Sequence, residues 1–310
     1  MSGLKKWMML AFAFSLIVLG GCSGKTAESE GDGKKLYITT TIGQIADAVK
    51  IIAGDKAEVH SLMGPGTDPH LYKATQGDME KLQEADIIFY SGLHLEGKML
   101  DIFEKMNEQK PTYAIAESIE PEKLLAADGS KAYDPHVWFD IDLWKTALKK
   151  AEEGLIKADP DNEQYYRENA DAYFAEMDEL KRFAEKEMAG IPEEQRVLVT
   201  AHDAFGYFGR AYDMEVMGLQ GLSTDAEYGL GDVQALVDTL VTRNIKAVFV
   251  ESSISERSIN AVIEGAKEKG HTVSIGGELF SDAMGEEGTE EGTYLGMYRH
   301  NVDTIAKALK

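Results

Sequence analysis

Cysteine is nearly absent from this chain of 310 residues, and histidine is scarce. Cys22 is the only cysteine, so the chain can form neither an internal disulfide nor a zinc site built on paired cysteines. The seven histidines include no His-Glu-x-x-His pair, and no G-x-S-x-G nucleophile elbow is present. Gly92–Met99 nearly matches a phosphate-binding loop, but Met99 stands where a Ser or Thr would hold Mg²⁺. We therefore exclude nucleotide binding there.

Positive charge is also in short supply. Lysine and arginine number 32 against 54 aspartates and glutamates, which leaves a net charge of −22. Because nucleic-acid binding depends on neutralising phosphates, we exclude a nucleic-acid partner. The acidic excess favours solubility outside the cell.

Long apolar runs are missing except near the N-terminus. Two lysines precede an apolar run at residues 7–19, which is shorter than the roughly 20 residues that span a membrane comfortably. We interpret 1–21 as a secretory signal peptide rather than a transmembrane anchor. The Leu-Gly-Gly before Cys22 resembles the lipobox of bacterial lipoproteins, which implies lipidation of Cys22. Residues 22–35, which begin at this cysteine, are almost free of apolar side chains and are predicted to form a flexible tether.

The remainder of the chain alternates short β-rich runs with helical patterns, as in βαβ units. Near-continuous apolar runs predict strands that are covered on both faces. We predict an α/β fold of two lobes, 36–160 and 191–310, each with a mainly parallel sheet flanked by helices. The predicted strands are 36–41, 57–62, 86–90, 196–200, 215–218, 245–250 and 271–275, and the predicted helices include 44–52, 233–243 and 258–269.

Residues 161–190 separate the two lobes and contain no proline or glycine before Gly190. This pattern predicts one amphipathic helix of about eight turns that connects the lobes stiffly. Its apolar residues recur every three or four positions, at Tyr166, Ala170, Tyr173, Met177, Leu180 and Phe183.

Three histidines stand beside aspartates in segments that are predicted to follow strands or precede helices. Asp-Pro-His ends at His70 and again at His136, and Thr-Ala-His-Asp contains His202. Neutral imidazole is the commonest metal ligand in proteins, and a carboxylate often orients it. Open α/β sheets bind ligands at the carboxyl ends of their strands, where Asp282 is also expected. We predict one metal site from His70, His136, His202 and Asp282. The other histidines, His60, His94, His271 and His300, are assigned to packing or surface positions.

Four motifs carry a family resemblance. They are Gly-Pro-Gly-Thr-Asp-Pro-His-Leu-Tyr (64–72), Asp-Pro-His-Val-Trp-Phe-Asp (134–140), Thr-Ala-His-Asp-Ala-Phe-Gly-Tyr-Phe (200–208) and Ser-Asp-Ala-Met-Gly (281–285). With the lipobox and the long helix, their order resembles cluster A-I metal-binding lipoproteins, the substrate-binding components of manganese and zinc ABC importers. The resemblance covers essentially the whole mature chain and is greatest to the manganese-binding lipoproteins of Bacillus-type bacteria.

The resemblance implies a transport protein rather than an enzyme. His70, His136, His202 and Asp282 would hold the metal between the lobes, the first lobe supplying two ligands and the second lobe two. The protein would be a monomer, anchored by lipid to the outer face of the cytoplasmic membrane, that delivers metal to an ABC permease and its ATPase. Asp203 and Glu251 are candidates for orienting the ligands, and helix capping or a surface position is the alternative for both.

The identity of the metal is open between Mn(II) and Zn(II). Three imidazoles and one carboxylate, without a thiolate, disfavour soft ions and suit tetrahedral Zn(II). Mn(II) would need both carboxylate oxygens or further oxygen ligands. The Irving–Williams order predicts tighter Zn(II) binding in vitro whichever ion is carried in the cell.

Two departures from relatives bear on this choice. Some manganese-binding members have glutamate in place of His202, which favours zinc here. Zinc-specific members often have a His-rich loop before the second ligand, and 121–133 contain no histidine, which favours manganese. We choose Mn(II) on resemblance. A secreted metallohydrolase with Glu251 as its base, and an adhesin, are the more distant alternatives.

Overall fold

The computed structural model describes residues 35–127, 132–226 and 228–310. The predicted signal peptide (1–21), Cys22 and nearly all of the predicted tether (22–35) lie outside these residues. Among the described residues, no helix combines the length and the apolar character that a membrane crossing requires.

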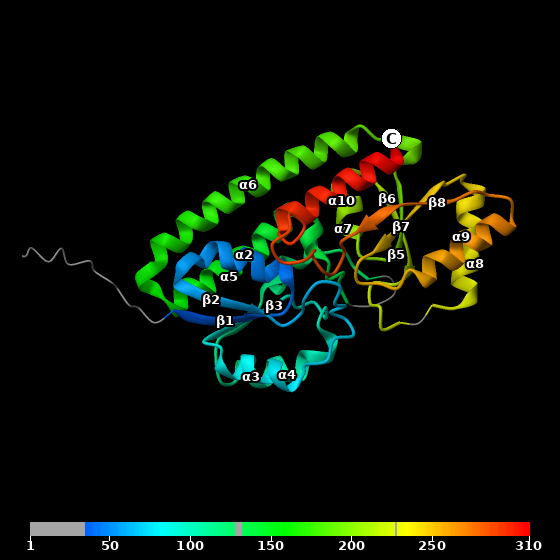
Figure 1. Ribbon diagram of the computed structural model, residues 1–310. Helices are drawn as coiled ribbons and strands as arrows, with labels where there is room; N and C mark the ends of the chain where they lie inside the picture. Colours follow the sequence, from blue (N-terminus) through cyan, green and yellow to red (C-terminus); the bar gives the residue numbers. More distant parts are fainter. Residues whose placement is uncertain (1–34, 128–131, 227) are drawn as a thin grey trace, which may run out of the picture. The chain divides into compact units, whose positions relative to one another are not determined.

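The first lobe is built on a parallel sheet with the strand order β2-β1-β3-β4. Ile38 in the central strand β1 pairs with Val59 on one side and with Ile87 on the other. Figure 1 shows helices α2 and α5 on one side of this sheet and α3 and α4 on the other, so its apolar central strands are buried. The elements are β1 (Leu36–Thr40), α2 (Gly43–Ala53), β2 (Ala57–Ser61), α3 (Gln76–Glu84), β3 (Ile87–Tyr90), α4 (Leu100–Asn107), β4 (Thr112–Ala114) and α5 (Ile141–Ala158).

The second lobe contains two parallel strand pairs, β5-β6 and β7-β8. Because β5 lies beside β7, the four strands follow the spatial order β6-β5-β7-β8. All residues of β5 and β7 are buried, as the continuous apolar runs predict. The elements are β5 (Val197–His202), α7 (Gly206–Tyr212), β6 (Glu215–Gln220), α8 (Leu230–Thr242), β7 (Ala247–Glu251), α9 (Arg257–Glu268), β8 (Ser274–Leu279) and α10 (Tyr294–Leu309). The predicted α/β class with parallel sheets is confirmed.

Every predicted strand differs from the observed bounds by at least one residue, and β4 was not predicted. β5 continues through His202, which was predicted to follow the strand, and β8 begins only at Ser274 and runs to Leu279. The predicted strand stopped at Ile275 because two glycines follow, and glycine is a poor strand former. Phe249 packs against the first of these glycines, Gly276, where a Cβ would come within 2.8 Å of its ring. Close packing between neighbouring strands therefore outweighs the local preference.

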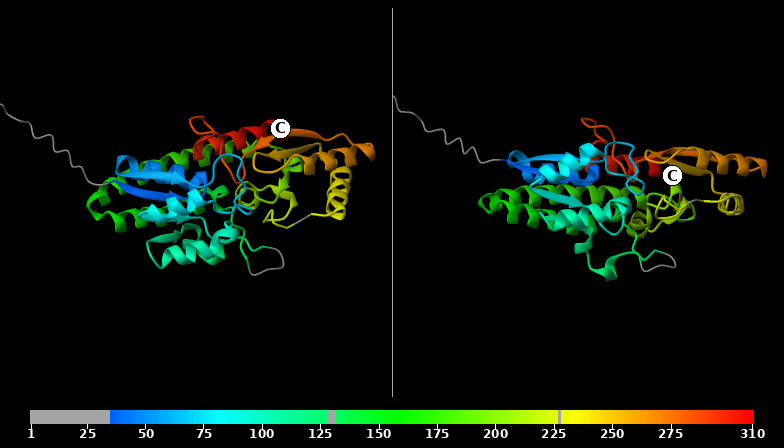
Figure 2. Two further views of the ribbon diagram at one scale, coloured as in Figure 1. Left: turned by 60° about the horizontal axis from the view of Figure 1, so that its bottom comes forward. Right: turned by 90° about the horizontal axis from the view of Figure 1, so that it is seen from below.

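Helix α6 (Glu163–Ala189) is the predicted long connector. It packs against α2 and α5 of the first lobe and against α10 of the second, and Figure 2 shows it running along both. Phe183 is half-buried: it packs against the core, and the guanidinium carbon of Arg299 lies 4.3 Å from its ring centroid. The buried face consists of Tyr166, Ala170, Tyr173, Phe174, Met177, Leu180, Ala184 and Met188.

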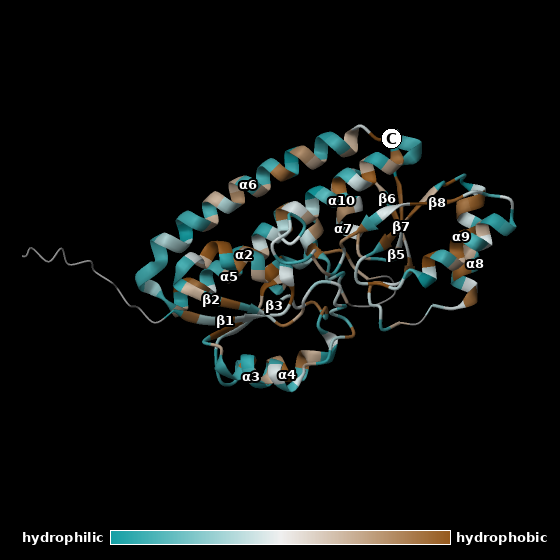
Figure 3. Cartoon of the chain, in the orientation of Figure 1, coloured by the Kyte–Doolittle hydropathy of each residue, from teal (hydrophilic) through white to brown (hydrophobic). Residues whose placement is uncertain are grey.

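The hydrophobic core is not interrupted between the lobes. The larger cluster of buried residues runs from the first sheet through α5 and α6 to α7 and α10, and a smaller cluster fills the space between the second sheet and helices α8 and α9. Figure 3 shows the apolar strands of both lobes inside predominantly hydrophilic outer helix faces. The loops that follow β2, β5 and β8 meet where the lobes adjoin.

Candidate metal centre

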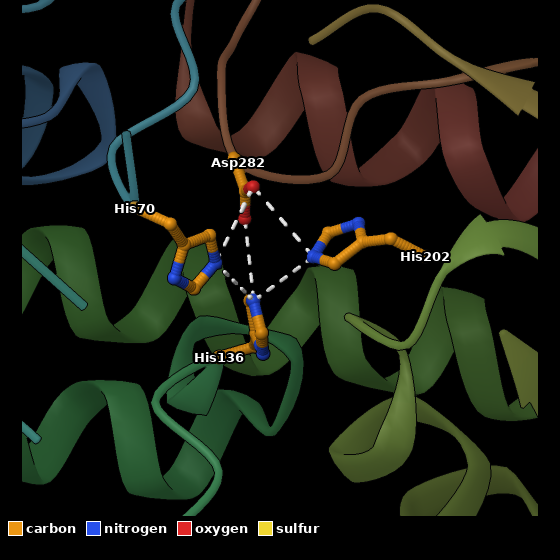
Figure 4. Close-up of side chains that lie close together, drawn as sticks. All are labelled: His70, His136, His202 and Asp282. Atoms are coloured by element: carbon orange, nitrogen blue, oxygen red, sulfur yellow. Dashed lines mark hydrogen bonds and ion pairs between the residues drawn. The ribbon is translucent and has the colours of Figure 1, made fainter. Parts of the chain in front are cut away.

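The four predicted ligands come from four separate segments and meet at one point. His70 lies in the loop after β2, and His136 immediately precedes the short 3₁₀ helix η5 (Val137–Phe139). His202 ends β5, and Asp282 follows β8. All four are at most 3% exposed. Figure 4 shows their side chains pointing toward one another, and one ligand atom from each lies within 4.8 Å of the others.

Five distances between these atoms are close to the edge length of a small tetrahedron. Nε2 of His136 lies 3.3 Å from Nε2 of His70 and 3.3 Å from Nε2 of His202. The Asp282 oxygens lie 3.3 Å from His136, 3.6 Å from His202 and 3.7 Å from His70. Zinc–nitrogen bonds of about 2.0–2.1 Å separate neighbouring tetrahedral ligands by roughly 3.3 Å. The cluster thus has the dimensions of a first-row divalent ion site.

Two of the histidines are oriented by carboxylates behind them. Nδ1 of His136 lies 2.7 Å from Oδ1 of Asp134, and Nδ1 of His202 lies 2.6 Å from Oε2 of Glu251. An Nδ1–H that donates to a carboxylate leaves the lone pair of a neutral imidazole on Nε2, the atom that faces the cluster. Both rings are therefore held in the tautomer that binds a metal.

The backbone fixes these carboxylates in turn. The backbone N–H of His202 donates to Oε1 of Glu251 at 2.8 Å, so both oxygens of Glu251 hold the same residue. The backbone N–H of His136 donates to Oδ1 of Asp134 at 2.9 Å. Gly206 at the start of α7 leaves room for Asp134, because a Cβ there would lie 2.7 Å from its Oδ2.

The His70 loop makes contacts across to the second lobe. Oδ1 of Asp68 accepts the backbone N–H of His70 at 2.9 Å, and Oδ2 accepts the hydroxyl of Thr224 at 2.6 Å. Nearby, Lys98 of the first lobe donates to Asp225 at 2.7 Å. The two Asp-Pro-His motifs thus have different roles: Asp134 orients its own histidine, whereas Asp68 joins the His70 loop to the opposite lobe.

Asp282 is a fully buried carboxylate, and among the described residues no group donates a hydrogen bond to either of its oxygens. A buried charge without partners is strongly unfavourable in a protein. Its oxygens instead face the Nε2 atoms of the three histidines. A positive charge between these atoms would satisfy all of them.

The pKa values of the four side chains are shifted by their burial and by one another's charges. Burial lowers the pKa of His70 to about 4. Burial also acts to lower the pKa of His136, but Asp134 and Asp282 outweigh it and raise this pKa to about 10. The pKa of His202 is raised by Glu251 and Asp282 against the effect of burial. Burial alone would raise the pKa of Asp282, but the three histidines hold it well below its usual range.

The other histidines lie apart from the cluster. His60, in β2, stacks on Tyr37 with ring centroids 4.5 Å apart. His271 and His300 donate through Nε2 to the carbonyls of Ile245 and Glu278, and His94 is exposed. None of them belongs to the cluster of potential ligands found among the described residues.

Sequence reasoning named one carboxylate that contacts a ligand and missed another. Glu251 was a candidate and contacts His202. Asp134 was not singled out, although its place in Asp-Pro-His was the available signal. Asp203 was the other candidate; its backbone N–H donates to the carbonyl of Gln220 beyond the end of β5, and its suggested role stays a prediction.

Comparison with known proteins places the chain in a family. Residues 38–308 match the family model described as "Zinc-uptake complex component A periplasmic". The chain is 56% identical over 307 residues to the manganese-binding lipoprotein MntA of Bacillus subtilis, covering 99% of this chain and 100% of that protein. It is 46% identical over 299 residues to the zinc-binding protein TroA of Treponema pallidum, covering 95% and 96% of the two.

A solved structure agrees with these sequence relationships. The periplasmic zinc-binding protein TroA of Treponema pallidum matches with a TM-score of 0.87 and 48% identity, covering 89% of this chain and 99% of that chain. The predicted arrangement of two lobes joined by one long helix is thereby confirmed. The chain belongs to the family of zinc-uptake complex component A, the metal-binding substrate-binding proteins.

Proposed function

We propose that this protein captures a divalent transition metal ion, Mn(II), and delivers it to an ABC permease and its ATPase. The ligands are His70, His136, His202 and Asp282. One observation carries the proposal: three imidazole nitrogens converge on a buried carboxylate whose two oxygens accept no hydrogen bond from any residue that the structure describes. A metal ion beside this carboxylate would offset the cost of burying its charge.

The relatives and the carboxylate together favour manganese. MntA, named for manganese, is 56% identical to the chain, and TroA, named for zinc, is 46% identical. Oδ1 of Asp282 faces His136, whereas Oδ2 faces His70 and His202. Because both oxygens lie toward the cluster, the site offers five donor atoms, as Mn(II) requires beyond tetrahedral coordination. Zn(II) is the alternative cargo and should bind more tightly in vitro.

The geometry favours capture over catalysis. A catalytic zinc site keeps one position open and places a general base beside it. Here four protein ligands surround one point, and all are buried. Glu251, the candidate base of a metallohydrolase, already accepts from both the backbone N–H and Nδ1 of His202. Members of the family are metal-binding transport proteins.

The ends of the chain complete the proposal. We place a signal peptide at 1–21 and a lipidated Cys22 with its tether at 22–35, which would hold a monomer on the outer face of the cytoplasmic membrane. We place the lobes at 36–160 and 191–310, with the connecting helix at 161–190. The lipoprotein names of relatives support the anchor.

Metal analysis of the purified protein tests the site. We expect one ion per chain in the wild type and in His60→Ala, whose imidazole lies outside the cluster. His136→Ala and Asp282→Ala should lose most of the bound metal. Equal metal content in all four proteins would refute the site, and unchanged manganese uptake in a strain lacking the gene would refute the transport role.

Mn(II)/Zn(II) competition tests the choice of metal. His202→Glu replaces an imidazole by an oxygen ligand, and we expect it to shift preference toward Mn(II). An unchanged preference would show that this position does not determine selectivity.

A further inference from the structure

Asp282 differs from the other ligands in how it is held. Asp134 and Glu251 orient two of the histidines, but the Asp282 carboxylate accepts no hydrogen bond from the part of the chain that the structure describes. Its position must therefore come from the backbone of the segment after β8. The contacts of that backbone determine which lobe holds the fourth ligand.

Side chains of the first lobe bind this backbone directly. Nε2 of Gln44, on α2, donates to the carbonyl of Asp282 at 3.1 Å and approaches the carbonyl of Ser281 at 3.5 Å. Nε1 of Trp138, in η5, donates to the same Ser281 carbonyl at 3.1 Å. Both side chains are fully buried. Asp282 belongs to the second lobe in sequence, yet its carbonyl is bound by the first.

Chemistry determines which end of the Gln44 amide faces the segment. Both partners are carbonyl oxygens, which only accept, so the NH₂ group must face them. Gly43, the residue before Gln44, also packs closely against this segment, since a Cβ at Gly43 would lie 3.1 Å from Cε of Met284. The N-terminal end of α2 is therefore packed against the Asp282 segment on both sides of the ligand.

The second lobe holds the same segment two residues before Asp282. Asn301 of α10 accepts the backbone N–H of Phe280 at 2.9 Å and donates to its carbonyl at 2.7 Å. The two side-chain amides thus bind different parts of the segment. Asn301 of the second lobe binds its start, and Gln44 of the first lobe binds the ligand residue itself.

We infer that Gln44 is a positioning residue for metal capture, a role that rests on the proposed function. It ties the Asp282 backbone to the lobe that carries His70 and His136. The three ligands then form one face, and His202 with Glu251 approaches from the other lobe. This departs from the two-and-two division of ligands expected from chain order.

Gln44→Met tests the inference, because methionine keeps the length and helix preference of glutamine but donates no hydrogen bond. We expect Mn(II) and Zn(II) affinity to fall about tenfold, within the range found when groups that orient metal ligands are lost. The matched control is Asn169→Leu. Nδ2 of Asn169 donates to the Ile52 carbonyl at 3.0 Å, which is the same kind of bond away from the site. The control should lose stability without losing affinity.

A spectroscopic readout separates positioning from general stability. At saturating Co(II), the d–d absorption reports the coordination geometry, and Gln44→Met should change it while Asn169→Leu should not. Gln44→Asn, whose amide is one methylene shorter, is a second variant with the same expected direction. Thermal unfolding of the metal-free proteins establishes that each variant is folded.

The outcomes distinguish this inference from the proposed function. Wild-type affinity and a wild-type Co(II) spectrum in folded Gln44 variants would overturn the role of Gln44, provided that His136→Ala still loses metal. An equal loss of affinity in Asn169→Leu would also overturn it. Absence of stoichiometric binding by the wild type would refute the proposed function itself.

Discussion

Replacing Glu251 by glutamine tests whether this carboxylate orients His202 for the proposed metal site. Oε1 of Glu251 accepts the backbone N–H of His202, and Oε2 accepts its Nδ1–H. Glutamine offers one acceptor and one NH₂ group, so one of these two N–H groups must face another donor. If the ring changes tautomer to avoid this conflict, the proton moves to Nε2 and the nitrogen no longer binds metal.

The expected loss follows from the role of such partners. Loss of a group that orients a metal-bound histidine weakens binding by about 10- to 100-fold, or roughly 1.4–2.7 kcal/mol. Competition with a chelating indicator measures this for Zn(II) and Mn(II). Glu268→Gln, at an exposed position in the same lobe, removes the same charge and should bind as the wild type does.

A thermodynamic cycle makes the test specific. In a His202→Ala background, Glu251→Gln should cost little further affinity, because the ring that it orients is gone. Affinity within twofold of the wild type for Glu251→Gln, or an equal loss in Glu268→Gln, would refute the reasoning.

Three further predictions follow from the surroundings of the site. Thr224→Val removes the hydrogen bond that the Thr224 hydroxyl donates to Asp68 across the lobes. Because such a bond is worth about 1.5 kcal/mol, metal should dissociate about tenfold faster. Transfer of the metal to a chelator measures this rate, and an unchanged rate would contradict the prediction. Gly206→Ala places a Cβ 2.7 Å from Oδ2 of Asp134 and should weaken binding, whereas Gly221→Ala, with open space around its Cβ, should not; equal affinities would refute the steric argument. The pKa of His136 is raised to about 10, so metal binding at neutral pH should release about one proton per chain, and metal affinity should rise with pH. Calorimetry in buffers of different ionisation enthalpy measures the number of protons released, and a value of zero would contradict this prediction.

Much of the architecture follows from local patterns. The alternation of apolar strands with amphipathic helices predicts two parallel α/β lobes, because strands buried on both faces must be continuously apolar. The spacing from Tyr166 to Leu180 predicts the long helix for the same kind of reason. Local patterns did not place the end of β8, because Phe249, which packs against Gly276, is distant in the sequence.

The candidate site likewise has features that follow from the local sequence and features that depend on the fold. Its chemistry is local, since imidazoles beside Asp at strand ends already indicate a metal, and the Asp-Pro-His turn that brings Asp134 to His136 spans three residues. The orientation of the other ligands is not local: Glu251 is 49 residues from His202, and Gln44 is 238 residues from Asp282. The sequence determined by itself which side chains could bind a metal. Only the tertiary structure decided which buried groups orient these side chains, because a buried polar group forms its hydrogen bond with a partner that the fold brings within about 3 Å.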